Sequence, residues 1–142
     1  MRTQYQILVF PYIRTSKGYE YCLFKRKDLK VWQGIAGGGE EGETALESAK
    51  RETYEEALIP VSSKYILLRS IGSVPAKSIS AFKDLGVKTI PEYSFGVEVR
   101  SKKLTIGHEH TEYGWFTYEE AINKLNWDSN KKAMTELNTK LV

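Results

Sequence analysis

The sequence is poor in cysteine and has no long apolar run. Its single cysteine, Cys22, cannot form a disulfide within the chain, and such usage is typical of a reducing cytoplasm. No apolar segment approaches the roughly 18–20 residues that a membrane helix needs. The apolar stretch near the N-terminus is interrupted by Pro11, Tyr12 and Arg14 and lacks a small-residue cleavage site. We therefore expect a cytoplasmic protein without a membrane span or a signal peptide.

Internal repeats, low-complexity segments and linkers rich in Pro, Gly and Ser are also missing from the sequence. A chain of 142 residues is long enough to bury one core, so we expect residues 1–142 to form a single domain. The net charge is +3, but no module of aromatic and basic residues accompanies it, so we expect no nucleic-acid partner. The sequence does not fix the oligomeric state, and a homodimer is compatible with it.

Strands and helices are both predicted, without a regular alternation of the two. Alternating side chains and short apolar runs predict strands at residues 4–13, 19–26, 65–71, 93–99 and 113–116. The weakly patterned segment 72–92 is expected to be a long loop, of the kind that often lines a ligand site. This mixture predicts an α+β fold, an α/β/α sandwich in which a mixed sheet carries helices on both faces.

Capping residues mark the starts of the helices. Capping boxes, in which a threonine precedes a glutamate by three residues, are formed by Thr44 with Glu47 and by Thr117 with Glu120. The first helix is expected to run to about Leu58 and the second to Leu125. Asp128 is expected to cap a last helix. The inner face of that helix would carry Ala133, Met134, Leu137 and Leu141.

The glycines that precede the first helix match a known pattern. Gly37, Gly39 and Gly42 fit the G-x-G-x-x-G fingerprint of dinucleotide-binding proteins. Glu40 and Glu41 would then lie inside the loop that receives a pyrophosphate, and their negative charges would repel it. The acid that the fingerprint requires about 20 residues further on is also missing. We therefore reject the dinucleotide-binding interpretation.

Negative charge is concentrated in residues 40–56, which hold seven glutamates and two basic residues in a chain of net charge +3. Glu52, Glu55 and Glu56 are spaced i, i+3 and i+4, so they form one stripe along the helix. Like charges at this spacing repel one another, and a hard divalent cation such as Mg²⁺ removes the repulsion. The stripe indicates a magnesium site, and an exposed acidic helix is the alternative.

Residues 37–59 resemble the signature of the Nudix hydrolase family. The residues that match its spacing are Gly37, Glu43, Arg51, Glu52, Glu55, Glu56 and Ile59. The resemblance implies a loop and a helix that together hold magnesium. Two positions depart from the family pattern: Thr53 stands at an apolar position, and Leu58 replaces the glycine that closes the helix in a left-handed cap. We therefore expect this helix to end differently, with Pro60 as the stop.

Shorter matches resemble the branch of the family that includes dihydroneopterin triphosphate and dATP pyrophosphohydrolases. They are Trp32-Gln33-Gly34, His108-Glu109-His110, Tyr113-Gly114-Trp115 and Trp127-Asp128-Ser129-Asn130. Together with the longer signature they extend the resemblance over most of the chain. They imply the Nudix fold and a small nucleotide-type substrate.

The resemblance also implies roles for individual residues. The metal ligands would be Gly37, through its carbonyl, and Glu52, Glu55, Glu56 and Glu109, with Mg²⁺ or Mn²⁺ as the ion. Glu52, oriented by Arg51, and Glu109 are the two candidates for the general base, and Glu43 would support Arg51 by pairing with it. The substrate-binding residues would be Arg26, Trp32, Gly38, His110 and Tyr113, with packing as the alternative role of both aromatic residues.

The implied reaction is the Mg²⁺-dependent hydrolysis of a phosphoanhydride in a nucleoside triphosphate or an analogue. A dATP-like compound or dihydroneopterin triphosphate would give pyrophosphate and a monophosphate. ADP-ribose or a dinucleoside polyphosphate is the alternative substrate. A domain that binds nucleotide without turnover is the third hypothesis, and the intact set of Arg51, Glu52, Glu55 and Glu56 argues against it.

Overall fold

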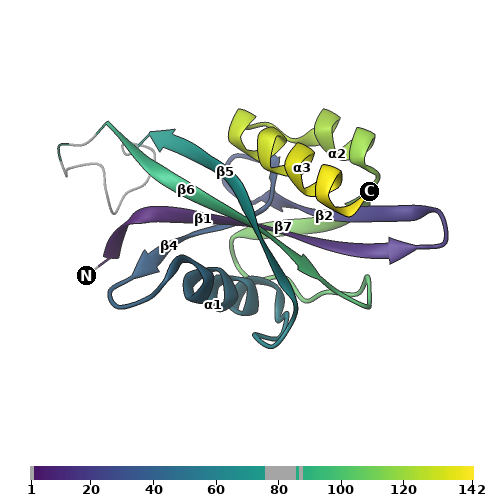
Figure 1. The fold of residues 1–142 in the computed structure, drawn as a ribbon, viewed down its shortest axis with the longest axis horizontal. Helices are drawn as coiled ribbons and strands as arrows, with labels where there is room; N and C mark the ends of the chain where they lie inside the picture. Colours follow the sequence, from purple (N-terminus) through teal and green to yellow (C-terminus); the bar gives the residue numbers. More distant parts are fainter. Residues whose placement is uncertain (1, 76–85, 87) are drawn as a thin grey trace.

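The computed structural model describes residues 2–75, 86 and 88–142 (Figure 1). The elements follow in the order β1 (Arg2–Thr15), β2 (Gly18–Arg26), β3 (Trp32–Gln33), β4 (Ile35–Glu40), α1 (Ala45–Ala57), β5 (Tyr65–Pro75), β6 (Thr89–Glu98), β7 (His110–Phe116), α2 (Tyr118–Lys124) and α3 (Asp128–Leu141). None of these helices in the described part of the chain combines the length and apolar character needed to cross a membrane.

The described strands form one seven-stranded mixed sheet with β1 at its centre. β1 runs parallel to β6 and antiparallel to β2 and β4, and β5 continues the sheet beyond β6. β7 pairs with β2 in the antiparallel sense. Figure 1 shows α1 on one face of the sheet and α2 with α3 on the other. The expected α+β fold with helices on both faces is therefore confirmed.

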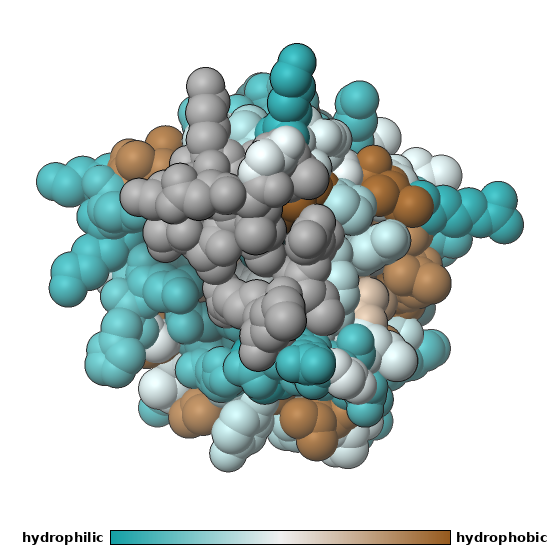
Figure 2. Space-filling view, turned by 90° about the vertical axis from the view of Figure 1, so that its left-hand side faces the viewer, coloured by the Kyte–Doolittle hydropathy of each residue, from teal (hydrophilic) through white to brown (hydrophobic). Residues whose placement is uncertain are grey.

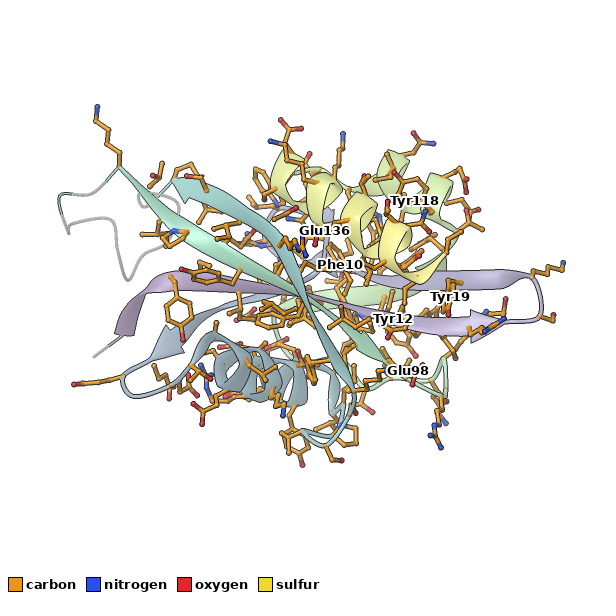
Figure 3. All side chains as sticks on the ribbon, viewed as in Figure 1. Phe10, Tyr12, Tyr19, Glu98, Tyr118 and Glu136 are labelled. Carbon is orange, nitrogen blue, oxygen red and sulfur yellow. The ribbon has the colours of Figure 1, made fainter. Side chains whose placement is uncertain are left out.

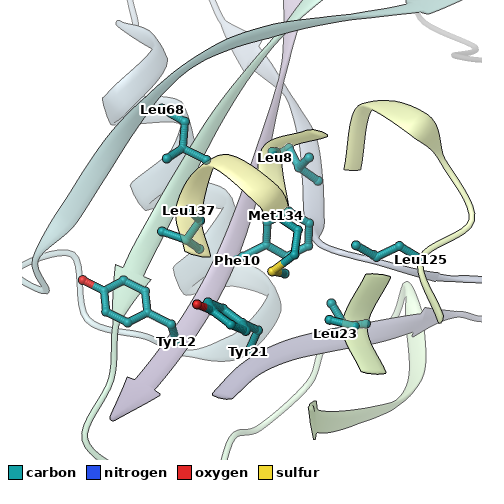
Figure 4. Close-up of a cluster of buried hydrophobic side chains, with 11 residues drawn as sticks. Leu8, Phe10, Tyr12, Tyr21, Leu23, Leu68, Leu125, Met134 and Leu137 are labelled. Atoms are coloured by element: carbon teal, nitrogen blue, oxygen red, sulfur yellow. The ribbon is translucent and has the colours of Figure 1, made fainter. Parts of the chain in front are cut away.

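The alternation of side chains along β1 builds a core on each face of the sheet. Leu8, Phe10 and Tyr12 pack with Met134 and Leu137 beneath α3 (Figure 4). Ile7 and Val9, which alternate with them, belong to the other core, together with residues of α1. Complete burial of a leucine, phenylalanine or methionine side chain stabilises the fold by roughly 1.5–3 kcal/mol relative to leaving it exposed. One core therefore holds α1 against the sheet, and the other holds α2 and α3.

The starts of the helices agree with the capping signatures at two places and differ at a third. Thr44 Oγ1 accepts a hydrogen bond from the Glu47 N–H at 3.1 Å, and Glu47 Oε1 accepts one from the Thr44 N–H at 2.8 Å. The capping box at the start of α2 is also present. The prediction for α3 was wrong, because its N-cap is Trp127 without a side-chain bond and Asp128 is the first helical residue. The negative charge of Asp128 in the first turn of α3 still interacts favourably with the helix dipole.

The inner face predicted for α3 is confirmed. Ala133, Met134 and Leu137 are fully buried, and Leu141 packs against the same core while partly exposed. Gly96 of β6 lies beneath Leu137, whose Cδ1 would be 2.6 Å from a Cβ at that position. The helix therefore approaches the sheet at a place where β6 has no side chain.

The strand predictions missed β3 and β4. Residues 37–39 were expected in a loop, but they belong to β4, whose backbone pairs with β1 from Ile35 to Gly38. Glycine has no side chain and a low strand preference, so its sequence pattern does not predict a strand. Pairing with the central strand β1 decides the conformation of this segment instead.

The segment 72–92, expected to be a loop, is shortened by strands at both of its ends. β5 continues to Pro75 and β6 begins at Thr89, and the two strands pair up to these residues. This part of the prediction was wrong, because cross-strand pairing extends beyond the apolar pattern visible in the sequence. Residues 76–85 and 87 of the expected loop lie outside the described residues.

β5 is an edge strand that a side chain of α3 partly covers. Its register against β6 shifts between Leu67 and Ile71. Near this shift Glu136 accepts hydrogen bonds from the backbone N–H groups of Arg69 and Ser70, at 2.5 and 2.7 Å (Figure 3). Two donors that another strand would otherwise use are thereby satisfied.

On the end of the molecule seen in Figure 2, hydrophobic residues lie in separate patches between hydrophilic ones.

We expected α1 to end differently from the glycine-capped helix of the family pattern, and this expectation was wrong. Leu58 itself adopts the left-handed conformation, with φ 53° and ψ 29°, and its N–H bonds to the Tyr54 carbonyl at 2.9 Å. The helix end therefore has the geometry that glycine normally provides, before Pro60 is reached. A Cβ in this conformation costs roughly 1–2 kcal/mol. The side chain recovers little of this cost by packing, since it is 51% exposed.

Replacing Leu58 with glycine should stabilise the protein. The change removes the strain of a Cβ at positive φ but adds entropy to the unfolded chain, so we expect a net gain of about 0.5–1 kcal/mol in the free energy of unfolding. Urea denaturation measures this difference. Leu58→Ala is the matched control, because it shortens the side chain and keeps the Cβ. Equal stabilisation by alanine would show that the left-handed conformation is not the source.

Candidate active site

Arg51 lies at the centre of a network that joins α1 to β4. Its Nε donates to Glu43 Oε2 at 2.7 Å, and its Nη2 donates to the Gly38 carbonyl at 2.9 Å. Its Nη1 donates to Glu52 Oε1 at 2.9 Å and to Glu55 Oε1 at 3.2 Å. One guanidinium thus neutralises several carboxylates and fixes their positions relative to the strand.

Glu43 anchors this network. Besides Arg51, its Oε1 accepts hydrogen bonds from Ser48 Oγ and from the Glu40 N–H, both at 2.8 Å. The Tyr5 hydroxyl of β1 lies 2.7 Å from Ser48 Oγ. Hydrogen bonding to Arg51, followed by that to the Glu40 N–H and Ser48, lowers the pKa of Glu43 to about 2. Glu43 is therefore ionised at neutral pH and holds Arg51 in place, as the sequence predicted.

Glu52 lies buried against the backbone of β4. A Cβ added to Gly37 would be 2.3 Å from Glu52 Cδ, so only glycine leaves room for this carboxylate. Burial raises the pKa of Glu52, and the hydrogen bond from Arg51 opposes that rise. The structure thus brings Glu52 directly beside Gly37, two of the residues expected to bind metal.

Glu56 is a buried carboxylate whose Oε2 has no hydrogen-bond partner within the described residues. Burial and the nearby charges of Glu109 and Glu52 raise its pKa to about 7. Its backbone carbonyl accepts a hydrogen bond from the Gly107 N–H at 2.7 Å. A Cβ on Gly107 would lie 2.8 Å from Glu56 Oε2, so the loop passes close to this carboxylate.

Glu109 approaches the helix from a loop far away in sequence. Its charge contributes to raising the pKa of both Glu52 and Glu56, so these carboxylates lie near one another. Its backbone carbonyl accepts a hydrogen bond from the Lys27 N–H at 2.9 Å, and its side chain is exposed. Glu109 is therefore exposed to solvent, whereas Glu52 and Glu56 are buried.

Trp32 and Tyr113, the two aromatic residues predicted to contact the substrate, contact other parts of the protein in this structure. Trp32 lies edge-on against Phe116, with ring centroids 5.4 Å apart, at the margin of the core on the α3 side. The Tyr113 hydroxyl accepts a hydrogen bond from the Leu104 N–H at 2.9 Å and so holds the loop that leads to Glu109. These contacts favour the packing alternative for both residues.

The other predicted substrate contacts differ in their access to solvent. The Arg26 side chain is 33% exposed and donates to Asp28 at the end of β2, and the Gly38 carbonyl is bonded to Arg51. His110 was expected to contact substrate directly, but its side chain is fully buried, with Nδ1 3.4 Å from Glu56 Oε2. This expectation is corrected: in the observed conformation His110 reaches the site only through Glu56.

Sequence reasoning missed two residues that shape the site. Gly107 holds the end of α1 through its N–H, and Ser48 supports Glu43 through its hydroxyl. Neither residue has a pattern that marks it, although Gly107 directly precedes the His-Glu-His stretch. Gly107 acts through the contact between its loop and α1. Ser48 acts on Glu43, which lies five residues earlier in the chain.

The chain matches the NUDIX domain family over residues 5–137, a span that contains every site residue described above. It belongs to the Nudix hydrolase family. Nudix hydrolases act on small nucleotide-type substrates and generally use divalent metal ions.

Two Nudix relatives illustrate the similarity, one of them by both its sequence and its structure. The dihydroneopterin triphosphate diphosphatase of Escherichia coli (strain K12) is 29% identical over 136 residues, covering 92% of this chain and 89% of that enzyme. A crystal structure of a NUDIX hydrolase from Listeria monocytogenes superposes with a TM-score of 0.90 at 40% identity, covering 98% and 94% of the two chains. The E. coli dihydroneopterin triphosphate pyrophosphohydrolase superposes with a TM-score of 0.83 at 25% identity, covering 98% and 97%.

The residues of this Nudix site suit a divalent cation bound through oxygen. Carboxylates and a close backbone segment converge, and hard cations prefer such ligands. Burial, and then repulsion by neighbouring glutamates, raise the pKa of Glu52 and Glu56, and a bound cation would favour their ionised forms. Within the described residues, however, no three His, Cys, Asp or Glu side chains are grouped closely enough to hold a metal ion. Arg51 bonds to Glu52 Oε1 and to Glu55 in this arrangement, and no bond from Arg51 to Glu52 Oε2 is among them.

Replacing Glu43 with glutamine should destabilise the Nudix domain in a pH-dependent way. Since the pKa of Glu43 falls from 4.5 to about 2, the stabilisation is fully present above pH 4.5 and is lost as the pH falls towards 2. We expect a loss of about 1–3 kcal/mol in the free energy of unfolding at pH 7. Urea denaturation at pH 7, 4 and 3 should show the difference between wild type and variant shrinking.

Glu40→Gln is the matched control for this experiment. Glu40 lies 3.9 Å from the same Arg51 but is 59% exposed, so its loss should change the free energy of unfolding by less than about 0.5 kcal/mol. A difference for Glu43→Gln that stays constant between pH 7 and pH 3 would contradict the assigned ion pair.

Proposed function

We propose that this protein catalyses the Mg²⁺-dependent hydrolysis of a phosphoanhydride in a nucleoside triphosphate or an analogue, releasing pyrophosphate and a monophosphate. The observation that carries the proposal is the cluster of glutamates on α1, in which Glu52 lies between Gly37 and Arg51 and Glu56 follows one turn later. Such a cluster of negative charge suits a cation that binds polyphosphate. The similarity to dihydroneopterin triphosphate diphosphatase supports a substrate of that type or a dATP-like one. Residues 1–142 would act as one catalytic domain.

The proposed ligands of Mg²⁺, with Mn²⁺ as an alternative, are the Gly37 carbonyl and the carboxylates of Glu52, Glu55, Glu56 and Glu109. When bound, the ion supplies positive charge to phosphate oxygens and lowers the pKa of a water molecule. Arg51 orients the carboxylate of Glu52 through its Nη1, and Glu43 keeps the guanidinium in place. The glycine backbone at Gly37 leaves the carboxylate room beside β4.

The general base is assigned to Glu109 in this proposal. Glu52, the other candidate, is buried and its Oε1 accepts a hydrogen bond from Arg51, which favours a fixed charged role. Glu109 is exposed on a loop that is held to α1 by the Gly107 N–H. An exposed carboxylate next to the cluster can take the proton of an attacking water and release it to solvent.

Arg26 is the proposed contact for a substrate phosphate. Its guanidinium lies at the end of β2, where Arg26 pairs with His110 of β7 in the sheet. Its present partner, Asp28, is exposed, and such surface ion pairs contribute at most about 1 kcal/mol. A polyphosphate can therefore replace Asp28 at low cost.

A substrate panel with Mg²⁺ tests the reaction, with pyrophosphate, phosphate and mononucleotide measured separately. We expect pyrophosphate and a monophosphate from dihydroneopterin triphosphate or a deoxynucleoside triphosphate. AMP with ribose 5-phosphate from ADP-ribose, or cleavage of a dinucleoside polyphosphate, would replace the proposed substrate by the alternative one. Tight nucleotide binding without turnover of any compound would overturn the enzymatic assignment. A cytoplasmic location, a homodimer and the absence of a nucleic-acid partner stay predictions.

Replacing Glu56 with glutamine should lower kcat by several orders of magnitude and leave the fold intact. The amide keeps the shape of the side chain but removes the negative charge proposed to bind the cation. Stability should not fall, because burial already disfavours the ionised form of Glu56. Steady-state kinetics at saturating Mg²⁺ measure the loss, and circular dichroism checks the fold.

Glu119→Gln controls for the substitution itself. Glu119 is exposed on α2, on the opposite face of the sheet from α1, so its change should leave kcat close to that of the wild type. Near-normal kcat for Glu56→Gln would contradict the proposed metal site.

A further inference from the structure

We propose that His110 is a positioning residue for Glu56, whose Oε2 accepts a hydrogen bond from the Nδ1–H of His110. This inference rests on the proposed function, since it concerns a carboxylate assigned to the metal. It gives a role to a buried histidine that otherwise has no contact with the open site.

The contact joins polar atoms that have no other partner within the described residues. His110 Nδ1 lies 3.4 Å from Glu56 Oε2. Neither ring nitrogen of His110 nor Oε2 of Glu56 has a hydrogen-bond partner there. Buried polar atoms in proteins are almost always paired. A movement of a few tenths of an ångström gives a bond of ordinary length, at most about 3.2 Å, and satisfies both Nδ1 and Oε2.

The surroundings hold the imidazole ring in one place. His110 is the first residue of β7 and pairs with Arg26 of β2. Its ring packs against Phe24, with centroids 5.3 Å apart, and its side chain is fully buried. A ring fixed on two sides presents its nitrogen to Glu56 in a constant direction.

The backbone near Glu56 is fixed as well. The Gly107 N–H bonds to the Glu56 carbonyl at 2.7 Å, and the absence of a side chain on Gly107 leaves the space that the carboxylate occupies. The side chain of Glu56 itself can still rotate. A donor at Oε2 restricts that rotation and leaves Oε1 to meet the cation.

The ring is suited to donate a single hydrogen bond. A neutral imidazole carries one N–H, and Nδ1 is the ring nitrogen that faces Glu56 Oε2. Residues that orient a metal ligand from behind typically change metal affinity by about 10–100-fold when they are replaced. A positioning role therefore predicts an effect on metal binding that is separate from any effect on folding.

The experiment compares three replacements of His110 by their affinity for Mn²⁺ without substrate. His110→Asn places an amide N–H near the position of Nδ1, His110→Gln places it near Nε2, and His110→Phe keeps ring volume without a donor. Isothermal titration or the electron paramagnetic resonance of free Mn²⁺ gives the dissociation constant. We expect His110→Gln and His110→Phe to bind Mn²⁺ about tenfold or more weakly than wild type, and His110→Asn to bind within about threefold.

Comparison of the polar variants keeps the test valid if His110→Phe does not fold. Equal Mn²⁺ affinity of His110→Asn and His110→Gln would overturn the inference, since a donor at Nδ1 would then not matter. His108→Asn is the control: His108 is exposed two residues earlier and should leave the affinity unchanged.

The experiment also separates this inference from the proposed function. Wild-type protein that binds Mn²⁺, together with His110→Gln and His110→Phe variants that bind it equally well, would overturn the role of His110 alone. Failure of the wild-type protein to bind Mn²⁺ would overturn both. A kcat that recovers in His110→Gln at high Mn²⁺, with KM for substrate unchanged, would support positioning of the metal ligand.

Discussion

The arrangement of this site depends on one guanidinium. Arg51 is the positive charge that lets Glu43, Glu52 and Glu55 lie close together without strong mutual repulsion, and its bond to the Gly38 carbonyl ties the helix to the sheet. Because Glu43 is itself bonded to Ser48, which touches a tyrosine of β1, the guanidinium is held by the central strand as well. The same hydrogen bonds of Arg51 therefore balance the negative charges and hold α1 against the sheet.

Space is the second constraint, and two glycines provide it. Gly37 lies so close to Glu52 that a Cβ would overlap the carboxylate, and Gly107 stands in the same relation to Glu56. Neither position has the positive φ that usually explains a glycine. One glycine comes from β4 and the other from the loop before β7, so two segments that are far apart in the sequence enclose the two carboxylates. This close enclosure explains why burial is the largest cause of the raised pKa at both.

The parts of the structure that the sequence predicted well are those set by local interactions. The capping box at Thr44 fixes where α1 begins, and the spacing of Glu52, Glu55 and Glu56 places them on one stripe whatever the rest of the chain does. Leu58 was misread because its residue type argues against a conformation that the helix end and the following chain impose on it. The strand β4 was missed for a similar reason, since glycines carry no pattern and pairing with β1 decides.

From the sequence alone we could identify the family, the helix that carries the acidic stripe and its arginine, because a motif of fixed spacing on a helix needs no partner to place its side chains. The burial of His110 behind Glu56, and the effect of Glu109 on the pKa of that carboxylate, depend on the tertiary structure. These residues are more than 50 positions apart along the chain. Burial and charge at such separations depend on how β2, β7 and α1 pack, which no local pattern records.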